Sequence, residues 1–263
     1  MADSLWTLRV LFALIFIALL YKVHQAWRGK KIFIRRIPGL NNIDEAVGRA
    51  VEMGRPALFC PGSNWGIEKV PTLAALALLQ YIADLAARLS LRLVIPICVP
   101  NILPAAQTIC SEAWKAHGKE DLYDGDDIRF LPGGQLYFAI ASLGLMRREN
   151  VAAGFYFGHW EAESIMFGET GQALGAIQIA GTEQLFQIPF FIATCDYVLI
   201  AEEFYAASAY LSRDPVMVGS IAGQDIAKMV FISIVVLLAV SATIVALGGG
   251  TPLGNWLSVL LSR

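Results

Sequence analysis

Charged side chains are scarce in this chain of 263 residues, where Asp, Glu, Lys and Arg make up 16% of the sequence, against about 25% in ordinary soluble proteins. The hydrophobic share is 56% and the mean hydropathy is +0.57. An intrinsically disordered chain has the opposite composition, so extensive disorder is excluded. The formal net charge of −2 leaves no excess of cations for a polyanion, and we expect no nucleic-acid partner.

Cysteine is also rare, and the short motifs of common active sites are missing. The cysteines number four, too few for a disulfide scaffold, and we interpret them as buried thiols. They are Cys60, Cys98, Cys110 and Cys195. The sequence contains no GxGxxG after the first predicted strand, no GxxxxGKS or GxxxxGKT, and no GxSxG. We therefore expect no cofactor, no metal ion and no catalytic residue.

The first long apolar run is Leu5 to Tyr21, which we predict to belong to a membrane-spanning helix over residues 5–27. The run approaches the length that crosses a bilayer, about 20 residues, and Arg9 is near enough to one end to reach the headgroups. A cleaved signal peptide is the alternative. It is disfavoured because the large positive cluster follows the run and no small-residue cleavage site is present.

The second long apolar run is Met229 to Leu247, which carries no charge and is followed by three glycines. We predict a second membrane helix over 229–247. A connector over 214–228 leads into it, and an outer tail over 248–263 follows it. In this tail Trp256 favours an interfacial helix, because tryptophan anchors such segments at the membrane surface.

Lysine and arginine follow the first run closely and are nearly absent beyond the outer ends of the two runs. This bias predicts both termini outside and residues 22–228 in the cytoplasm. From Lys22 to Arg36 there are six basic residues and no acid, whereas residues 37–228 carry a net charge of −9. We assign the basic segment, 28–42, to anionic lipid headgroups, with ordinary positive-inside bias as the alternative. The predicted headgroup contacts are Arg28, Lys30, Lys31, Arg35 and Arg36.

Between the two runs, residues 43–213 alternate short apolar segments with helical patterns, which predicts one α/β domain. Strands are predicted at 56–60, 91–99, 128–131, 151–157, 176–180 and 197–200. Helices are predicted at 43–53, 71–90, 104–117, 135–148, 161–174, 183–194 and 202–211. The strands are continuously apolar, which is typical of a parallel sheet covered on both faces. We expect an open, mostly parallel, Rossmann-like sheet, in which Pro96 marks an edge strand or a bulge.

Small and polar residues follow each predicted strand, where open α/β sheets bind their ligands. The candidate ligand crevice comprises Ser63, Asn64, Asn101, Gln135, His159, Glu161 and Thr182. The alternative is that these are ordinary turn residues, with His159 at a strand end and the neighbouring acids, Glu161 and Glu163, facing water. A nucleophilic pair of Cys195 with His159 is conceivable, although a buried cysteine is the commoner arrangement.

Aromatic residues crowd the end of the α/β domain and predict a protein interface. They are Phe186, Phe190, Phe191, Phe204, Tyr205 and Tyr210. The predicted helix at 202–211 also has few polar positions for a free surface helix. The alternative is that these aromatics fill the core of the sheet.

Two stretches, Ile37 to Pro56 and Gly175 to Arg213, resemble an uncharacterised family of bacterial membrane proteins catalogued as a domain of unknown function. The resemblance implies an α/β domain tethered to membrane helices, and it carries no known activity. We expect a structural or scaffold subunit of the bacterial inner membrane, without catalytic activity, that assembles with itself or within a larger membrane complex. The alternative is a ligand-binding or enzymatic domain that uses the strand-end crevice.

Overall fold

The computed structural model describes residues 2–29 and 39–246, and the chain divides into two compact units. One unit, residues 35–213, contains the α/β domain. The other joins residues 1–34 to residues 214–263 and contains two long helices, α1 (Ala2–Trp27) and α9 (Pro215–Ala246). Of the predicted headgroup contacts, Lys30, Lys31, Arg35 and Arg36 lie outside the described residues, as does the tail 248–263.

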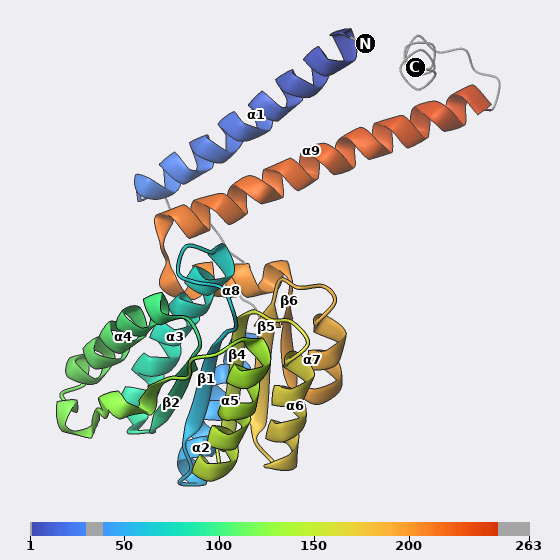
Figure 1. Ribbon diagram of the computed structural model, residues 1–263. Coiled ribbons are helices and arrows are strands. Elements are labelled where there is room, and N and C mark those ends of the chain that lie inside the picture. The colour runs from blue at the N-terminus through green and yellow to red at the C-terminus, as the bar shows by residue number, and fades with distance from the viewer. Residues whose placement is uncertain (1, 30–38, 247–263) are drawn as a thin grey trace. The chain divides into compact units, whose positions relative to one another are not determined.

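The α/β domain is built on a six-stranded parallel sheet, which confirms the predicted α/β fold with a parallel sheet (Figure 1). Its strands are β1 (Ala57–Gly62), β2 (Leu93–Ile97), β3 (Ile128–Phe130), β4 (Ala153–His159), β5 (Ile177–Thr182) and β6 (Tyr197–Ile200). The strand order is β3-β2-β1-β4-β5-β6. The order therefore reverses between β1 and β4, as in doubly wound dinucleotide-binding folds.

Helices cover both faces of the sheet, as predicted (Figure 1). They are α2 (Gly39–Glu52), α3 (Val70–Leu89), α4 (Leu103–Ala116), α5 (Gln135–Glu149), α6 (Ser164–Ala173), α7 (Ile188–Thr194) and α8 (Glu202–Ser212). Alternate strand residues feed two separate cores, because successive side chains of a strand point to opposite faces. Phe59 and Phe157 pack in the core with α2, α3, α4 and α8, whereas Leu58 and Tyr156 pack in the core with α5, α6 and α7.

The structure refines one local prediction and corrects another. β2 as a whole is not an edge strand, because it lies between β1 and β3, but at Pro96 it pairs with β3 alone, so the proline occupies a local edge position. β2 pairs with β1 as far as Val94 and with β3 from Ile95 to Ile97. Pro96 therefore lies where β2 no longer pairs with β1. The helix predicted over 183–194 begins only at Ile188 and places Pro189 in its first turn, where proline costs no hydrogen bond.

By length and composition, the described residues include two helices able to cross a membrane, α3 and the stretch Pro215–Leu237 of α9. α3 is a core helix of the α/β domain, since 67% of its apolar window is buried, against 6% for the stretch in α9. The predicted first span, Leu5 to Tyr21, lies within α1. The predicted connector, 214–228, is helical from Pro215 and continues without a break into the predicted second span.

Two glycines of α9 let it pack closely against α1. A Cβ atom added to Gly219 would lie 2.5 Å from the Cα of Val23, and one added to Gly223 would lie 3.0 Å from the Cα of Leu19. The helices are therefore antiparallel, since the later residue of α9 meets the earlier residue of α1. Glycines four residues apart are a frequent contact between membrane helices.

Candidate functional site

The carboxyl ends of β1 and β4 form the centre of the candidate site, because the strand order reverses between them. In open α/β sheets, ligands bind in the crevice that such a reversal creates. All seven predicted crevice residues lie at this edge of the sheet, at or just after the ends of β1 to β5. They are Ser63, Asn64, Asn101, Gln135, His159, Glu161 and Thr182.

Two glycines bring the ends of β1 and β4 together. Gly62 and Gly158 have positive φ angles of 87° and 123°, which glycine adopts without strain. A Cβ atom on Gly62 would lie 2.5 Å from the carbonyl oxygen of His159, and one on Gly158 would overlap the carbonyl oxygen of Pro61. This close approach allows the backbone N–H of Ser63 to donate to the carbonyl of His159 at 3.1 Å. Ser63 and His159 are thus held side by side.

Glu163 is the acceptor that organises one half of the site. Only 2% of its surface is exposed, and it lies immediately before the first residue of α6. Its carboxyl group accepts hydrogen bonds from the Ser63 hydroxyl and the Gln135 side-chain amide, and at 3.2 Å from the backbone N–H of Glu161. The expectation that the acids near His159 face water is therefore wrong for Glu163, because three neutral donors compensate its loss of hydration.

His159 organises the other half of the site. Its Nδ1 lies 2.7 Å from Glu183 Oε1, and its Nε2 lies 3.7 Å from Glu161 Oε1. The indole of Trp65 stacks on the imidazole with ring centroids 3.5 Å apart and an angle of 5° between the planes. His159 is 2% exposed, so Trp65 covers a ring that a carboxyl group holds at Nδ1. A histidine oriented in this way is a frequent general base.

One carboxyl oxygen at the site lacks a hydrogen-bond partner among the described residues. This buried atom is Glu183 Oε2. Buried polar atoms are nearly always paired in folded proteins. A group that donates hydrogen bonds would satisfy Glu183 Oε2.

The charge of the crevice disfavours a nucleotide, although the strand order is that of a dinucleotide-binding fold. The acids at this edge include Glu161, Glu163 and Glu183. The nearby cation Lys69 makes a cation–π contact with Trp65, with its Nζ 5.6 Å from the centre of the ring. A pyrophosphate needs backbone N–H groups or cations rather than carboxyl groups.

Comparison with known proteins gives a family but no activity. Residues 2–251 match a domain of unknown function, DUF6754. The chain belongs to the DUF6754 family. No curated protein and no solved structure matches it. The family match spans nearly the whole of this DUF6754 chain and includes residues of both units.

The remaining predicted residues shape the loops of the DUF6754 crevice. Asn101 accepts a hydrogen bond from the backbone N–H of Ile67 at 3.2 Å and donates to Glu68 at 3.3 Å, which ties the loop after β1 to the end of β2. Thr182 accepts from the backbone N–H of Gln184 at 3.2 Å. Asn64 is exposed with a φ of 62°, a conformation that asparagine tolerates.

Three residues of the DUF6754 site were absent from the predicted set, namely Trp65, Glu163 and Glu183. Trp65 and Glu183 lie in the loops after β1 and β5, and Glu163 lies in the loop after β4. Their position directly after strands could have identified them as candidates. Their burial could not be predicted, because the sequence alone gives no reason for a glutamate in a turn to be buried.

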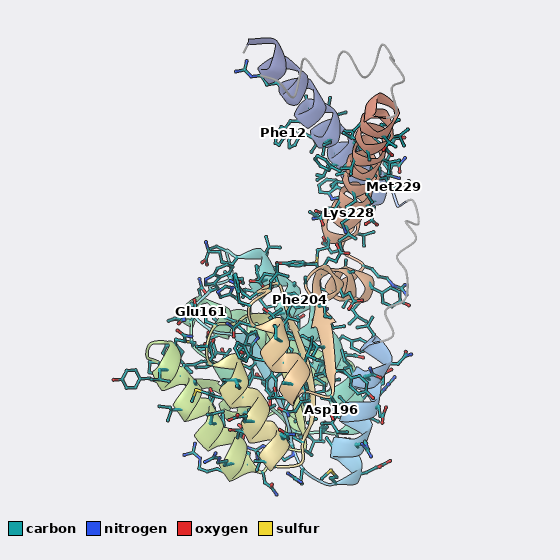
Figure 2. The ribbon with its side chains drawn as sticks, turned by 90° about the vertical axis from the view of Figure 1, so that its right-hand side faces the viewer. Phe12, Glu161, Asp196, Phe204, Lys228 and Met229 are labelled. Carbon is teal, nitrogen blue, oxygen red and sulfur yellow. The ribbon has the colours of Figure 1, made fainter. Side chains whose placement is uncertain are left out.

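Burial governs the acidity of the cysteine thiols of this DUF6754 protein. Burial raises the pKa of the Cys110 and Cys195 thiols to about 12, and it also raises the pKa of Cys60 and Cys98. Cys195 precedes β6, and Figure 2 shows the adjacent Asp196 far from Glu161 across the domain. The Cys195–His159 pair is therefore wrong. Within the residues that the structure describes, no three His, Cys, Asp or Glu side chains are grouped to hold a metal ion.

The six aromatics predicted as an interface divide between core and surface. Phe191 and Phe204 are fully buried and belong to the core, where Phe191 stacks on Tyr156 and Phe204 stacks on Phe157. Tyr205 and Tyr210 are half-buried. Phe186 and Phe190 are 84% and 42% exposed, and Leu185 and Ile192 beside them are 67% and 56% exposed. We name these four exposed residues the α7 patch.

Proposed function

We propose that this protein is a membrane-anchored structural subunit that assembles with itself or organises a larger membrane complex. In this proposal α1 and α9 cross the bacterial inner membrane, both termini lie outside, and the α/β domain is cytoplasmic. The exposed apolar side chains of both helices support the anchoring, for example Phe12 at 73% and Met229 at 70% (Figure 2). Exposed apolar side chains of this kind are stable in contact with lipid, and a helix satisfies its own backbone hydrogen bonds there. The basic segment that begins at Arg28 would then meet anionic headgroups.

The observation that carries the assembly role is the α7 patch. Its four residues lie on α7 and on the turn that precedes it. The adjoining edge strand β6 adds Tyr197 and Ile200, which are 39% and 44% exposed. Large exposed apolar surfaces mark protein contacts, and in this proposal the exposed side chains of α7 and β6 supply one. An edge strand also offers unpaired backbone groups to a partner.

The proposal is tested by the mass of the full chain extracted in mild detergent. We expect an oligomer or a co-purifying protein, and we expect Phe186→Ser to reduce the assembled fraction. Leu122→Ser is the matched control, because Leu122 is 60% exposed but lies outside the α7 patch. A monomer with no co-purifying partner contradicts the proposal.

A second candidate function, ligand binding at the crevice, rests on Glu183 Oε2. This buried oxygen has no partner in the described part of the chain, and it belongs to the carboxyl group that holds His159. We propose that the crevice takes a small, non-phosphorylated ligand that presents an amine or hydroxyl donor. Thermal unfolding of the full chain with amines, polyols and nucleotides tests this. We expect stabilisation by amines or polyols, lost in Glu183→Gln and kept in Glu169→Gln. Stabilisation by nucleotides alone contradicts the chemistry proposed.

A further inference from the structure

The packing of α1 and α9 fixes which of their residues lie at the same level along the helix axes. Gly219 is level with Val23, and Gly223 is level with Leu19. Each residue advances a helix by about 1.5 Å. Asp225, two residues beyond Gly223, is therefore level with Ile17, and Lys228 lies almost one turn further along α9.

The apolar surface of α1 places this level inside the membrane. Phe16, Ile17 and Leu20 are 54%, 61% and 49% exposed. A bilayer that began only at Met229 would leave these side chains in water. A bilayer that covers them also surrounds Asp225 and Lys228, which form an ion pair at 3.8 Å. Ionisable residues at such a depth are costly and are usually functional.

The ion pair lies on the face of α9 that points away from α1. Residues of a helix follow one another at about 3.6 per turn, which places Asp225 and Lys228 roughly half a turn from Gly219 and Gly223. The same face carries further residues at alternating spacings of four and three. The sequence of this stripe is Ile221, Asp225, Lys228, Ile232 and Val235. This is the spacing of helices that pack side by side as coiled coils.

We propose that this stripe is the contact between the α9 helices of two copies of the chain. The two charged side chains are 66% and 47% exposed, and a pair of opposite charges is self-complementary about a two-fold axis. In a parallel pair of α9 helices, the Asp225 of each copy is near the Lys228 of the other. Two consecutive polar positions in an otherwise apolar stripe fix the register of two helices, and polar side chains that meet across two helices hold them together in lipid. The inference rests on the proposed membrane anchoring.

Substitutions that exchange the two charges test the proposal, with two differently tagged copies of the chain and their association in native membranes as the measurement. We expect Asp225→Lys alone and Lys228→Asp alone to lose the dimer, because each puts four like charges together. Co-expression of the two single variants restores opposite charges, and we expect the mixed dimer to return. The double exchange Asp225→Lys with Lys228→Asp keeps both signs in one chain. The double exchange should retain the dimer. If a single variant fails to insert into the membrane, the double exchange still tests the proposal.

Cysteine cross-linking gives a second, geometric readout. We expect Ile232→Cys to form a disulfide-linked dimer and Leu237→Cys to form none, because Leu237 lies on the opposite side of α9. The unsubstituted chain controls for the four native cysteines. Equal cross-linking at both positions, or cross-linking at Ile232 that survives Asp225→Lys, overturns the inference. An assembly that persists without a cross-link at Ile232 overturns this contact alone, whereas extraction of the unsubstituted chain by alkali overturns the anchoring.

Discussion

The indole of Trp65 lies flat against the imidazole of His159, with their ring centroids 3.5 Å apart. Trp65 comes from the loop after β1, and His159 is the last residue of β4. The contact therefore joins the ends of two neighbouring strands at the reversal of strand order. Trp65 is itself half-exposed, so it is the covering group whose removal uncovers the histidine.

Trp65→Ala should make His159 reactive toward diethylpyrocarbonate. His159 is 2% exposed beneath the indole, and loss of the stacked pair should also lower the free energy of unfolding by about 1 kcal/mol. Mass spectrometry of the modified peptide measures the reactivity, with His117, whose side chain is 26% exposed, as an internal reference. Trp65→Phe keeps a ring and should keep the protection. If His159 is modified as fast in the unsubstituted chain as in Trp65→Ala, the indole does not cover the histidine.

Glu163→Ala should destabilise the α/β domain more than any change at the exposed acids of the crevice. It removes the acceptor of three donors, those of Ser63, Gln135 and the backbone of Glu161. Unsatisfied buried donors cost about 1–3 kcal/mol each, so we expect a loss of about 3 kcal/mol in denaturant unfolding followed by tryptophan fluorescence.

Glu163→Gln retains one acceptor oxygen and should lose less. Glu161→Gln is the matched control, because the Glu161 side chain is 46% exposed and its substitution should change the stability by less than about 0.5 kcal/mol. Equal losses for Glu163→Ala and Glu161→Gln would show that Glu163 does not organise the site.

Much of the domain could be predicted because its strands are short apolar runs that stop at Gly or Pro. The positions of the crevice residues followed from the same pattern, since the ends of parallel strands share one edge. The order of the strands could not be predicted. Whether β4 lies beside β1 or beside β3 depends on contacts between distant residues such as Gly62 and His159, and no local pattern encodes that pairing.

The partners inside the site were also beyond local patterns. Glu163 and Glu183 look like ordinary turn acids, and only the folded arrangement brings Ser63, Gln135 and His159 to them. The contact of α1 with α9 did carry a local signal, Gly219 and Gly223 at a spacing of four. The spans were instead inferred from uncharged length, which does not show which faces of two helices meet.

Glu149→Gln should make the stability of the domain less sensitive to acid. Burial raises the pKa of Glu149, but its hydrogen bond to Arg92 and the charges of Arg92 and Arg129 outweigh burial and lower it below the ordinary value of 4.5. A lowered pKa in the folded state gives a stabilisation that is present above pH 4.5 and lost as the pH falls through the folded-state pKa.

The unfolding midpoint in urea between neutral and acid pH measures this effect. At neutral pH Glu149→Gln should cost no more than about 1 kcal/mol, because the Arg92 side chain is half exposed and water screens the pair. The two chains should converge in stability as the pH falls. Glu112→Gln on the exposed face of α4 is the control and should leave the pH profile unchanged. A constant difference at all pH values contradicts the role given to the ion pair.

Gly219→Leu should separate α1 from α9. A side chain at Gly219 has no space, because even its Cβ would lie 2.5 Å from the Cα of Val23, and backbone atoms cannot move aside as a flexible side chain can. Gly144→Ala is the matched control, since a Cβ there has nothing within 4 Å and alanine favours a helix over glycine by about 1 kcal/mol. A disulfide between cysteines placed at Leu20 and Ser220 would report the contact in the full chain. We expect Gly219→Leu to abolish that disulfide and Gly144→Ala to leave it intact. Retention of the disulfide in Gly219→Leu would mean that the two helices do not depend on the glycine contact.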